Sequence, residues 1–115
     1  MNHQGSCHCG AVKYEVNAPI ERAMECNCSI CSRKGHLLAF IPATSFTLKQ
    51  GQDALSDYQF GKKHIHHLFC KTCGIGSFGK GKGPDGTEMI AVNVRSLENF
   101  DFKALPVDFY DGKSL

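Results

Sequence analysis

The sequence of 115 residues lacks a long hydrophobic run, and this absence excludes a membrane-spanning helix. Its longest apolar run, Leu37 to Ile41, is far shorter than the roughly 20 residues that cross a bilayer. The N-terminal residues also lack the basic patch and following apolar stretch of a signal peptide. We therefore expect a cytoplasmic protein with no membrane partner.

Long basic runs are also absent. Arg33-Lys34 and Lys62-Lys63 are only pairs, and the formal net charge is +2. Metal binding would change this balance, because seven bound thiolates and two zinc ions would bring the net charge to −1. The composition gives no reason to expect nucleic acid as a partner, and it leaves the oligomeric state open.

Sustained helical periodicity is missing, as are internal repeats, low-complexity tracts and linkers. A chain of this length suits one domain, which we place at residues 1–115. Short alternating or apolar segments are separated by turn residues, and this pattern favours a mostly-β domain. Strands are expected within 5–17, after its cysteine pair, and at 23–26, 36–41, 46–48, 55–60, 62–70, 88–94 and 106–110.

The remaining stretches are expected to be turns. Residues 29–34 predict a single helical turn that Gly35 ends, and 74–86 predicts a glycine-rich loop around a short segment near Phe78. Phe40, Phe69 and Phe78 are expected in the hydrophobic core.

Seven cysteines are many for a cytosolic chain, where disulfides rarely persist. Four of them form two pairs with the short spacings of metal ligands, Cys7 with Cys9 and Cys70 with Cys73. Four sulfurs complete the tetrahedron that zinc prefers. We interpret these two pairs as one structural zinc site that ties the start of the chain to its later half.

The remaining cysteines, Cys26, Cys28 and Cys31, have no fourth cysteine to join them. Three protein ligands leave one position of a tetrahedral zinc ion for water or substrate. Such an ion is a Lewis acid that can bind a substrate thiol as its thiolate. The alternative is a second structural zinc, with His36 or His8 as the fourth ligand.

Other polar residues are weaker candidates. His36 is the best candidate for a proton donor beside the three cysteines. Arg33 and Lys34 either hold substrate carboxylates or are ordinary surface charges. His64 and His66 would share one face of a strand and could bind metal, although such residues are more often a solvated strand face.

Five motifs occur in order along the chain: Gly5-Ser6-Cys7-His8-Cys9-Gly10, Cys26-Asn27-Cys28-Ser29-Ile30-Cys31-Ser32-Arg33-Lys34-Gly35, Phe69-Cys70-Lys71-Thr72-Cys73-Gly74, Val92-Asn93-Val94-Arg95-Ser96-Leu97 and Tyr110-Asp111-Gly112-Lys113. Together they resemble the glutathione-dependent formaldehyde-activating enzyme family, also called the GFA or CENP-V/GFA domain. The resemblance covers nearly the whole chain, and the ordered set of seven cysteines is its most specific part.

The resemblance implies a Mss4-like zinc-binding β-tent built from short antiparallel strands. It implies two zinc ions per chain: a structural one on Cys7, Cys9, Cys70 and Cys73, and a catalytic one on Cys26, Cys28 and Cys31. The implied activity joins formaldehyde to glutathione, giving S-hydroxymethylglutathione, which is formally a carbon–sulfur lyase reaction in reverse. We therefore expect a zinc-dependent carbon–sulfur lyase whose partners are a small thiol such as glutathione and an aldehyde, with His36 beside the catalytic cysteines.

Two other functions fit the same residues. One is a non-catalytic zinc-binding module for protein or nucleic acid, although the near-neutral charge and the lack of a basic stripe count against nucleic acid. The other is a formaldehyde or metal-stress sensor, which would need reversible loss of zinc from Cys26, Cys28 and Cys31.

Overall fold

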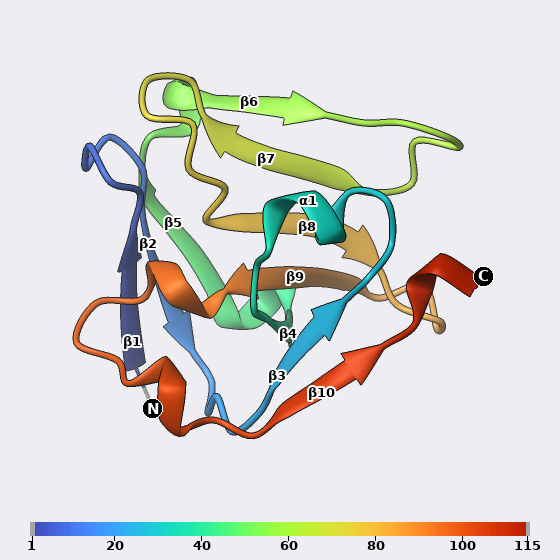
Figure 1. The fold of residues 1–115 in the computed structure, drawn as a ribbon. Helices are drawn as coiled ribbons and strands as arrows, with labels where there is room; N and C mark the ends of the chain where they lie inside the picture. The colour runs from blue at the N-terminus through green and yellow to red at the C-terminus, as the bar shows by residue number, and fades with distance from the viewer. Residues whose placement is uncertain (1, 115) are drawn as a thin grey trace.

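The computed structural model describes residues 2–114, in which ten strands form two sheets (Figure 1). The small sheet has the strand order β1-β2-β5, and the large sheet has the order β10-β3-β4-β9-β8-β7-β6. The strands are β1 (Asn2–Ser6), β2 (Lys13–Asn17), β3 (Ala23–Cys26), β4 (Leu38–Pro42), β5 (Phe46–Gln50), β6 (Leu55–Tyr58), β7 (His66–Cys70), β8 (Phe78–Lys82), β9 (Glu88–Asn93) and β10 (Val107–Tyr110).

In the described residues, helical structure is confined to single turns. The α-helix α1 (Cys31–Lys34) is joined by the 3₁₀ turns η1 (Ala43–Ser45), η2 (Gln52–Ala54), η3 (Val94–Ser96), η4 (Phe102–Ala104) and η5 (Gly112–Ser114). None of the helices in residues 2–114 is long and apolar enough to span a bilayer.

The hydrophobic core lies between the two sheets. Strand β2 alternates as its sequence predicts, with Tyr14 and Val16 fully buried and Lys13 exposed. These side chains belong to the same buried cluster as Ile90 and Val92 of β9, in the middle of the large sheet. The strands therefore pack by period-two alternation, and each sheet turns one face inward.

Three aromatic rings pack together in this core, two of them buried (Tyr14 and Phe78) and one half-buried (Phe46). The ring centroids of Phe46 and Phe78 are 4.6 Å apart, and that of Tyr14 lies 5.4 Å from Phe46. The Tyr14 hydroxyl lies 2.5 Å from the Ser96 hydroxyl, so its polar end is satisfied. Burial raises the pKa of Tyr14 to about 12, which keeps the phenol neutral.

Most predicted strands are present with shifted ends, and the helical turn before Gly35 is confirmed. Strand β1 was not predicted, because Asn2–Ser6 has no apolar alternation. Strand β7 begins only at His66, since Gly61 and Lys63 adopt positive φ in the turn before it. The predicted loop at 74–86 contains a full strand, β8, whose pairing with β9 outweighs the low strand propensity of its glycines.

Two of the three phenylalanines expected in the core lie elsewhere. Phe78 is buried, as predicted, but Phe40 is 50% exposed because it points outward on β4 between the buried Ala39 and Ile41. Phe69 is only half-buried and lies outside the core cluster.

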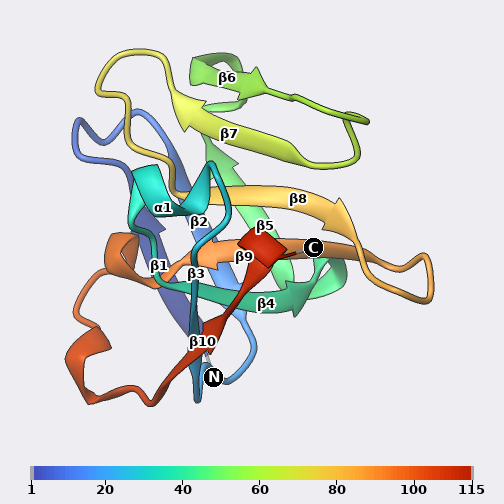
Figure 2. The same cartoon turned by 45° about the vertical axis from the view of Figure 1, so that its right-hand side comes forward.

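The large sheet also contains one parallel pair, which the expectation of antiparallel strands did not include. Strand β10 runs parallel to β3 (Figures 1 and 2). In this pairing Tyr110 lies opposite Cys26. Arg22 forms a bidentate ion pair with Asp108 across this pair, at 2.8 and 2.7 Å. The parallel pairing brings the end of the described chain to the three-cysteine segment.

Gly5 of β1 offers a test of how tightly the small sheet covers the core. A Cβ atom at this position would lie 2.0 Å from Cζ of Tyr14, so Gly5→Ala must displace the buried ring. We expect this change to lower the free energy of unfolding in urea by about 1–3 kcal/mol. Gly83→Ala is the matched control, because its Cβ would make only ordinary contacts, the nearest at 3.4 Å. Equal effects of the two changes would contradict the packing described.

Candidate metal centres

The first metal centre joins the two sheets. Cys7 follows β1, Cys9 lies in the next turn, Cys70 ends β7 and Cys73 lies in the turn after it. Figures 1 and 2 both show the turn after β1 beside the loop after β7. The four sulfurs all lie within 4.8 Å of one another, so the structure brings together the two pairs that the sequence predicted.

The spacing of these sulfurs fits zinc. The Sγ atoms of Cys7 and Cys9 are 3.7 Å apart, and those of Cys9 and Cys70 are 3.6 Å apart. A tetrahedral ion with zinc–sulfur bonds of about 2.3 Å requires sulfur–sulfur distances of about 3.8 Å. The four-sulfur group, Cys7, Cys9, Cys70 and Cys73, could therefore hold one zinc ion.

Tight turns aim these sulfurs inward. The amide of Val12 donates to Sγ of Cys7 at 3.3 Å, which fixes the direction of this sulfur. In the second turn, Gly74 has φ of 79° and its amide donates to the Cys70 carbonyl at 2.9 Å. Glycine adopts this left-handed conformation without strain, and Gly10, after the first cysteine pair, has a similar φ of 83°. The turn geometry therefore explains why a glycine follows each cysteine pair.

The electrostatics of this group call for a cation. Backbone amides of Cys9 and Ile75 lower the pKa of the Cys73 thiol to about 6, so Cys73 is largely a thiolate at neutral pH. At Cys9 the Ala11 amide lowers the pKa, but the Cys70 sulfur and desolvation outweigh it and raise the pKa to about 11. Sulfurs this close cannot all ionise unless a cation compensates their charge.

The second centre is built on one short segment. Cys26 ends β3, Cys28 lies in the following turn and Cys31 begins α1, and their sulfurs lie within 4.8 Å of one another. The amide of Ser32 donates to the Cys28 carbonyl at 2.9 Å, and this hydrogen bond closes the turn between Cys28 and Cys31. Gly35 then ends α1 with φ of 67°.

Within residues 2–114, this centre has three protein sulfurs and no fourth ligating side chain. The metal-ligand groups in residues 2–114 place neither His8 nor His36 with Cys26, Cys28 and Cys31. His8 is exposed in the turn of the first centre. The alternative of a closed site with either histidine as the fourth ligand is therefore not supported by the structure.

A segment near the end of the described chain packs directly on this centre. The Asn27 side chain donates to the Asp111 carboxylate at 2.7 Å and accepts from the Lys113 amide at 2.9 Å. A Cβ atom on Gly112 would lie 2.8 Å from Sγ of Cys26, so only glycine fits there. Sequence reasoning missed the role of Asn27 and Gly112, because only the parallel strand pair brings them together.

The three sulfurs lie in the wall of a cleft of about 340 Å³. Lys34, His36 and His67 also line it, together with apolar side chains that include Met24, Leu38, Phe40, Phe60, Ile65 and Tyr110. Lys34 and His36 meet at Gly76, where a Cβ atom would lie 2.9 Å from Cε1 of His36 and 3.4 Å from Nζ of Lys34. The lysine and the histidine thus lie close together beside the sulfurs.

Burial shapes the charge state of this cleft. Desolvation, with a contribution from the Lys34 ammonium, lowers the pKa of His36 to about 4, so His36 is a neutral imidazole at physiological pH. Desolvation also lowers the pKa of Lys34. The neighbouring Arg33 does not enter the cleft, since its guanidinium donates to the Ser29 carbonyl at 2.7 Å.

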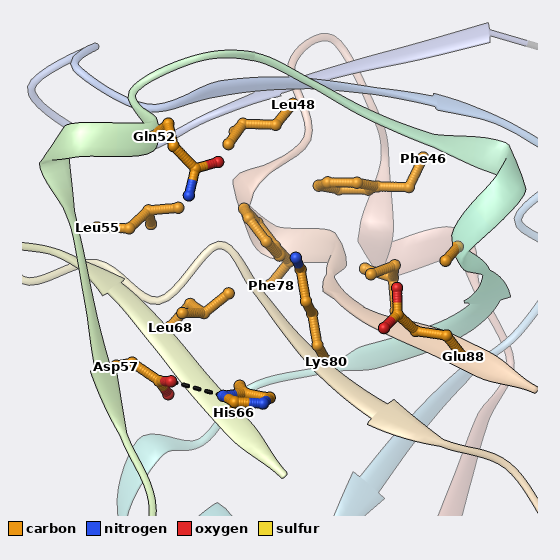
Figure 3. Close-up of a pocket in the computed structure, with 12 residues that line it drawn as sticks. Phe46, Leu48, Gln52, Leu55, Asp57, His66, Leu68, Phe78, Lys80 and Glu88 are labelled. Carbon is orange, nitrogen blue, oxygen red and sulfur yellow. Dashed lines mark hydrogen bonds and ion pairs between the residues drawn. The ribbon is translucent and has the colours of Figure 1, made fainter. Parts of the chain in front are cut away.

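A second cleft of about 560 Å³ opens between β5 and strands β6 to β9 (Figure 3). Phe46, Leu48 and Phe78 contribute to its apolar lining, and no cysteine lines it. At one edge, Nδ1 of His66 lies 2.5 Å from the Asp57 carboxylate. His64 and His66 are exposed and belong to no group of three or more metal ligands in residues 2–114, which fits a solvated strand face better than the alternative of metal binding.

Comparisons with known proteins agree with this picture. The family model described as "Glutathione-dependent formaldehyde-activating enzyme" matches residues 2–110. A crystal structure of a Rhodobacter sphaeroides protein, solved as a structural genomics target, is 33% identical to this chain. The match covers 90% of this chain and 98% of that one, with a TM-score of 0.77. The predicted mostly-β fold is confirmed.

The charge state of His36 can be measured directly. We expect an NMR titration of its ring protons, assigned with a His36→Gln variant, to show a midpoint near the lowered pKa of about 4. The unfolded chain then binds this proton more tightly than the folded chain. The free energy of unfolding is therefore unaffected by protonation of His36 above the ordinary pKa of 6.5, and it decreases as the pH falls from 6.5 toward 4. A midpoint at the ordinary value would show that the cleft does not desolvate the ring.

Proposed function

Because this chain belongs to the glutathione-dependent formaldehyde-activating enzyme family, we propose that it is a zinc-dependent carbon–sulfur lyase. Its substrate would be the adduct of a small thiol and an aldehyde, as in S-hydroxymethylglutathione. One observation carries the proposal: Cys26, Cys28 and Cys31 converge in the wall of a cleft, and no fourth side chain of residues 2–114 joins them. A module that only binds zinc for stability would need no such open side.

In this proposal the chain holds two zinc ions with different roles. Cys7, Cys9, Cys70 and Cys73 surround the structural ion, whose site is closed by four sulfurs. Cys26, Cys28 and Cys31 would hold the catalytic ion, which would supply Lewis acidity and bind the substrate sulfur as thiolate. The donor sets support this division, since closed sites are typically structural and three-ligand sites typically catalytic.

The side chains around the sulfurs suit the proton transfers of this reaction. In the lyase direction, neutral His36 accepts the hydroxyl proton of the adduct, the carbon–oxygen double bond forms and the carbon–sulfur bond breaks. The electron pair of the broken bond leaves with the sulfur. The proton on His36 then passes to the released thiolate, which becomes the free thiol, and in the reverse direction His36 takes the thiol proton and gives it to the oxygen.

Lys34 has a supporting electrostatic role. Its ammonium lies next to His36 at Gly76 and carries positive charge into a mostly apolar cleft. A partly desolvated cation stabilises negative charge that develops on the adduct oxygen more strongly than a solvated one. Because Gly76 leaves room for both side chains, the cation and the base can act on one oxygen atom.

Metal content tests the two-zinc assignment. We expect elemental analysis to give two zinc ions per wild-type chain and one in Cys28→Ser, which should remain folded because the four-sulfur site is intact. Cys73→Ser should instead unfold or lose several kcal/mol of stability, since it opens the site that joins the sheets. Ser29→Ala is the control, because Ser29 is an exposed neighbour in the same turn. A Cys28→Ser chain with unchanged zinc would contradict the assignment.

Activity tests the proposed reaction. We expect the zinc-loaded protein to accelerate exchange between formaldehyde, a thiol and their adduct, followed by NMR exchange spectroscopy. His36→Gln should slow this exchange by about 10²-fold, the usual effect of removing a general acid or base, with zinc content unchanged. Cys28→Ser should abolish the acceleration, whereas Ser29→Ala should retain it. Failure to accelerate exchange with any thiol would exclude the enzymatic function.

A further inference from the structure

Large apolar side chains gather around the cleft of the three sulfurs. Phe40, Phe60, Ile65 and Tyr110 all line this cleft, and each is between 43% and 51% exposed. Single exposed apolar residues are normal on a protein surface, but several around one cleft mark a binding site. The outer face of the large sheet is thus apolar where a solvated sheet face is normally polar.

The register of the sheet explains the shape of this surface. Phe40 of β4 lies opposite Ala91 of β9, which lies opposite Gly79 of β8, which lies opposite His67 of β7. Directly paired residues point to the same face of the sheet, so these four form one cross-strand row. The row has small residues in the middle and rings at both ends.

This row forms an apolar trough. Phe40 stands at one end, and at the other the ring of His67 stacks on Phe60 with their centroids 5.4 Å apart. Three strand spacings separate the ends, a distance of about 14 Å. The floor of Ala91 and Gly79 leaves space for an aromatic ring or an alkyl chain, and all these residues line the same cleft as the three sulfurs.

The charges in the trough are as informative as its shape. Lys34 is the only residue with a formal charge among those that line the cleft in the described chain, and no ion pair within residues 2–114 involves it. Glutathione carries two carboxylates and one ammonium group. Apart from the three sulfurs and the zinc they would hold, the cleft offers glutathione one cation and no carboxylate, so most of its charged groups would find no partner and would have to lose water.

These features point to a substrate class different from glutathione, and the inference rests on the proposed function. We propose that the cleft selects thiol–aldehyde adducts with an aryl or alkyl substituent and no more than one anionic group. The sulfur of the adduct lies beside Cys26, Cys28 and Cys31. Its apolar substituent lies in the trough between Phe40 and Phe60, and its anionic group faces Lys34.

Binding of three thiols to the zinc-loaded protein tests this selection without depending on activity. The thiols are benzyl mercaptan, 4-(mercaptomethyl)benzoate and glutathione, with affinities measured by isothermal titration calorimetry. We expect both aryl thiols to bind about tenfold or more tightly than glutathione, because the ring loses its contact with water in the trough. Exchange rates with formaldehyde, measured by NMR on the same samples, should follow the same order.

Matched variants locate the selecting residues. Phe40→Ala should weaken both aryl thiols about five- to tenfold and leave glutathione unchanged. In the wild-type protein we expect 4-(mercaptomethyl)benzoate to bind more tightly than benzyl mercaptan, because its carboxylate faces Lys34, and Lys34→Gln should remove this difference. Phe109→Ala is the control, since Phe109 is 65% exposed on β10 but lines no part of this cleft. Zinc content is measured for each variant, so that loss of metal is not mistaken for loss of contact.

The possible failures are distinct. If glutathione binds as tightly as the aryl thiols, or if Phe109→Ala weakens aryl binding as much as Phe40→Ala does, the selection inferred here is wrong and the lyase function stands. If the zinc-loaded protein binds none of the three thiols, the proposed function itself is wrong.

Discussion

The fold depends on the convergence of four sulfurs that come from two different sheets. Cys7 and Cys9 follow the first strand of the small sheet, whereas Cys70 and Cys73 follow β7 of the large sheet. Sulfurs 3.6–3.7 Å apart repel one another as thiolates, so their closeness calls for a shared cation. An ion there closes a loop of more than half the chain, and a small domain with a modest core gains most from such a link.

Such a link would leave the other three sulfurs free for the proposed chemistry. They lie on a single turn between β3 and α1, and the parallel strand β10 carries Gly112 onto them. Strand β7, which carries Cys70, belongs to the large sheet. Its neighbours β8 and β9 in the same sheet form the floor of the cleft. The proposed catalytic centre thus lies on the surface of the large sheet, whereas the proposed structural centre lies where the large sheet meets the small sheet.

The sequence alone predicted both cysteine groups and most strands, because cysteine spacing and period-two alternation are local signals. It could not predict β1, which lacks apolar residues, or β8, whose glycines are stabilised by pairing with β9. Phe40 was expected in the core because an apolar run does not show which residue points outward. The role of Gly112 was also hidden, since only the three-dimensional pairing of β10 with β3 places it against Cys26.

The central claim is that the ion held by Cys26, Cys28 and Cys31 keeps one position open for a substrate sulfur. A crystal of the zinc-loaded protein soaked with a small thiol, with anomalous data collected at the zinc edge, tests it most directly. We expect two zinc peaks per chain, one surrounded by four cysteine sulfurs and one by three cysteine sulfurs and the sulfur of the thiol. A single peak, or a protein side chain in that fourth position, would contradict the claim.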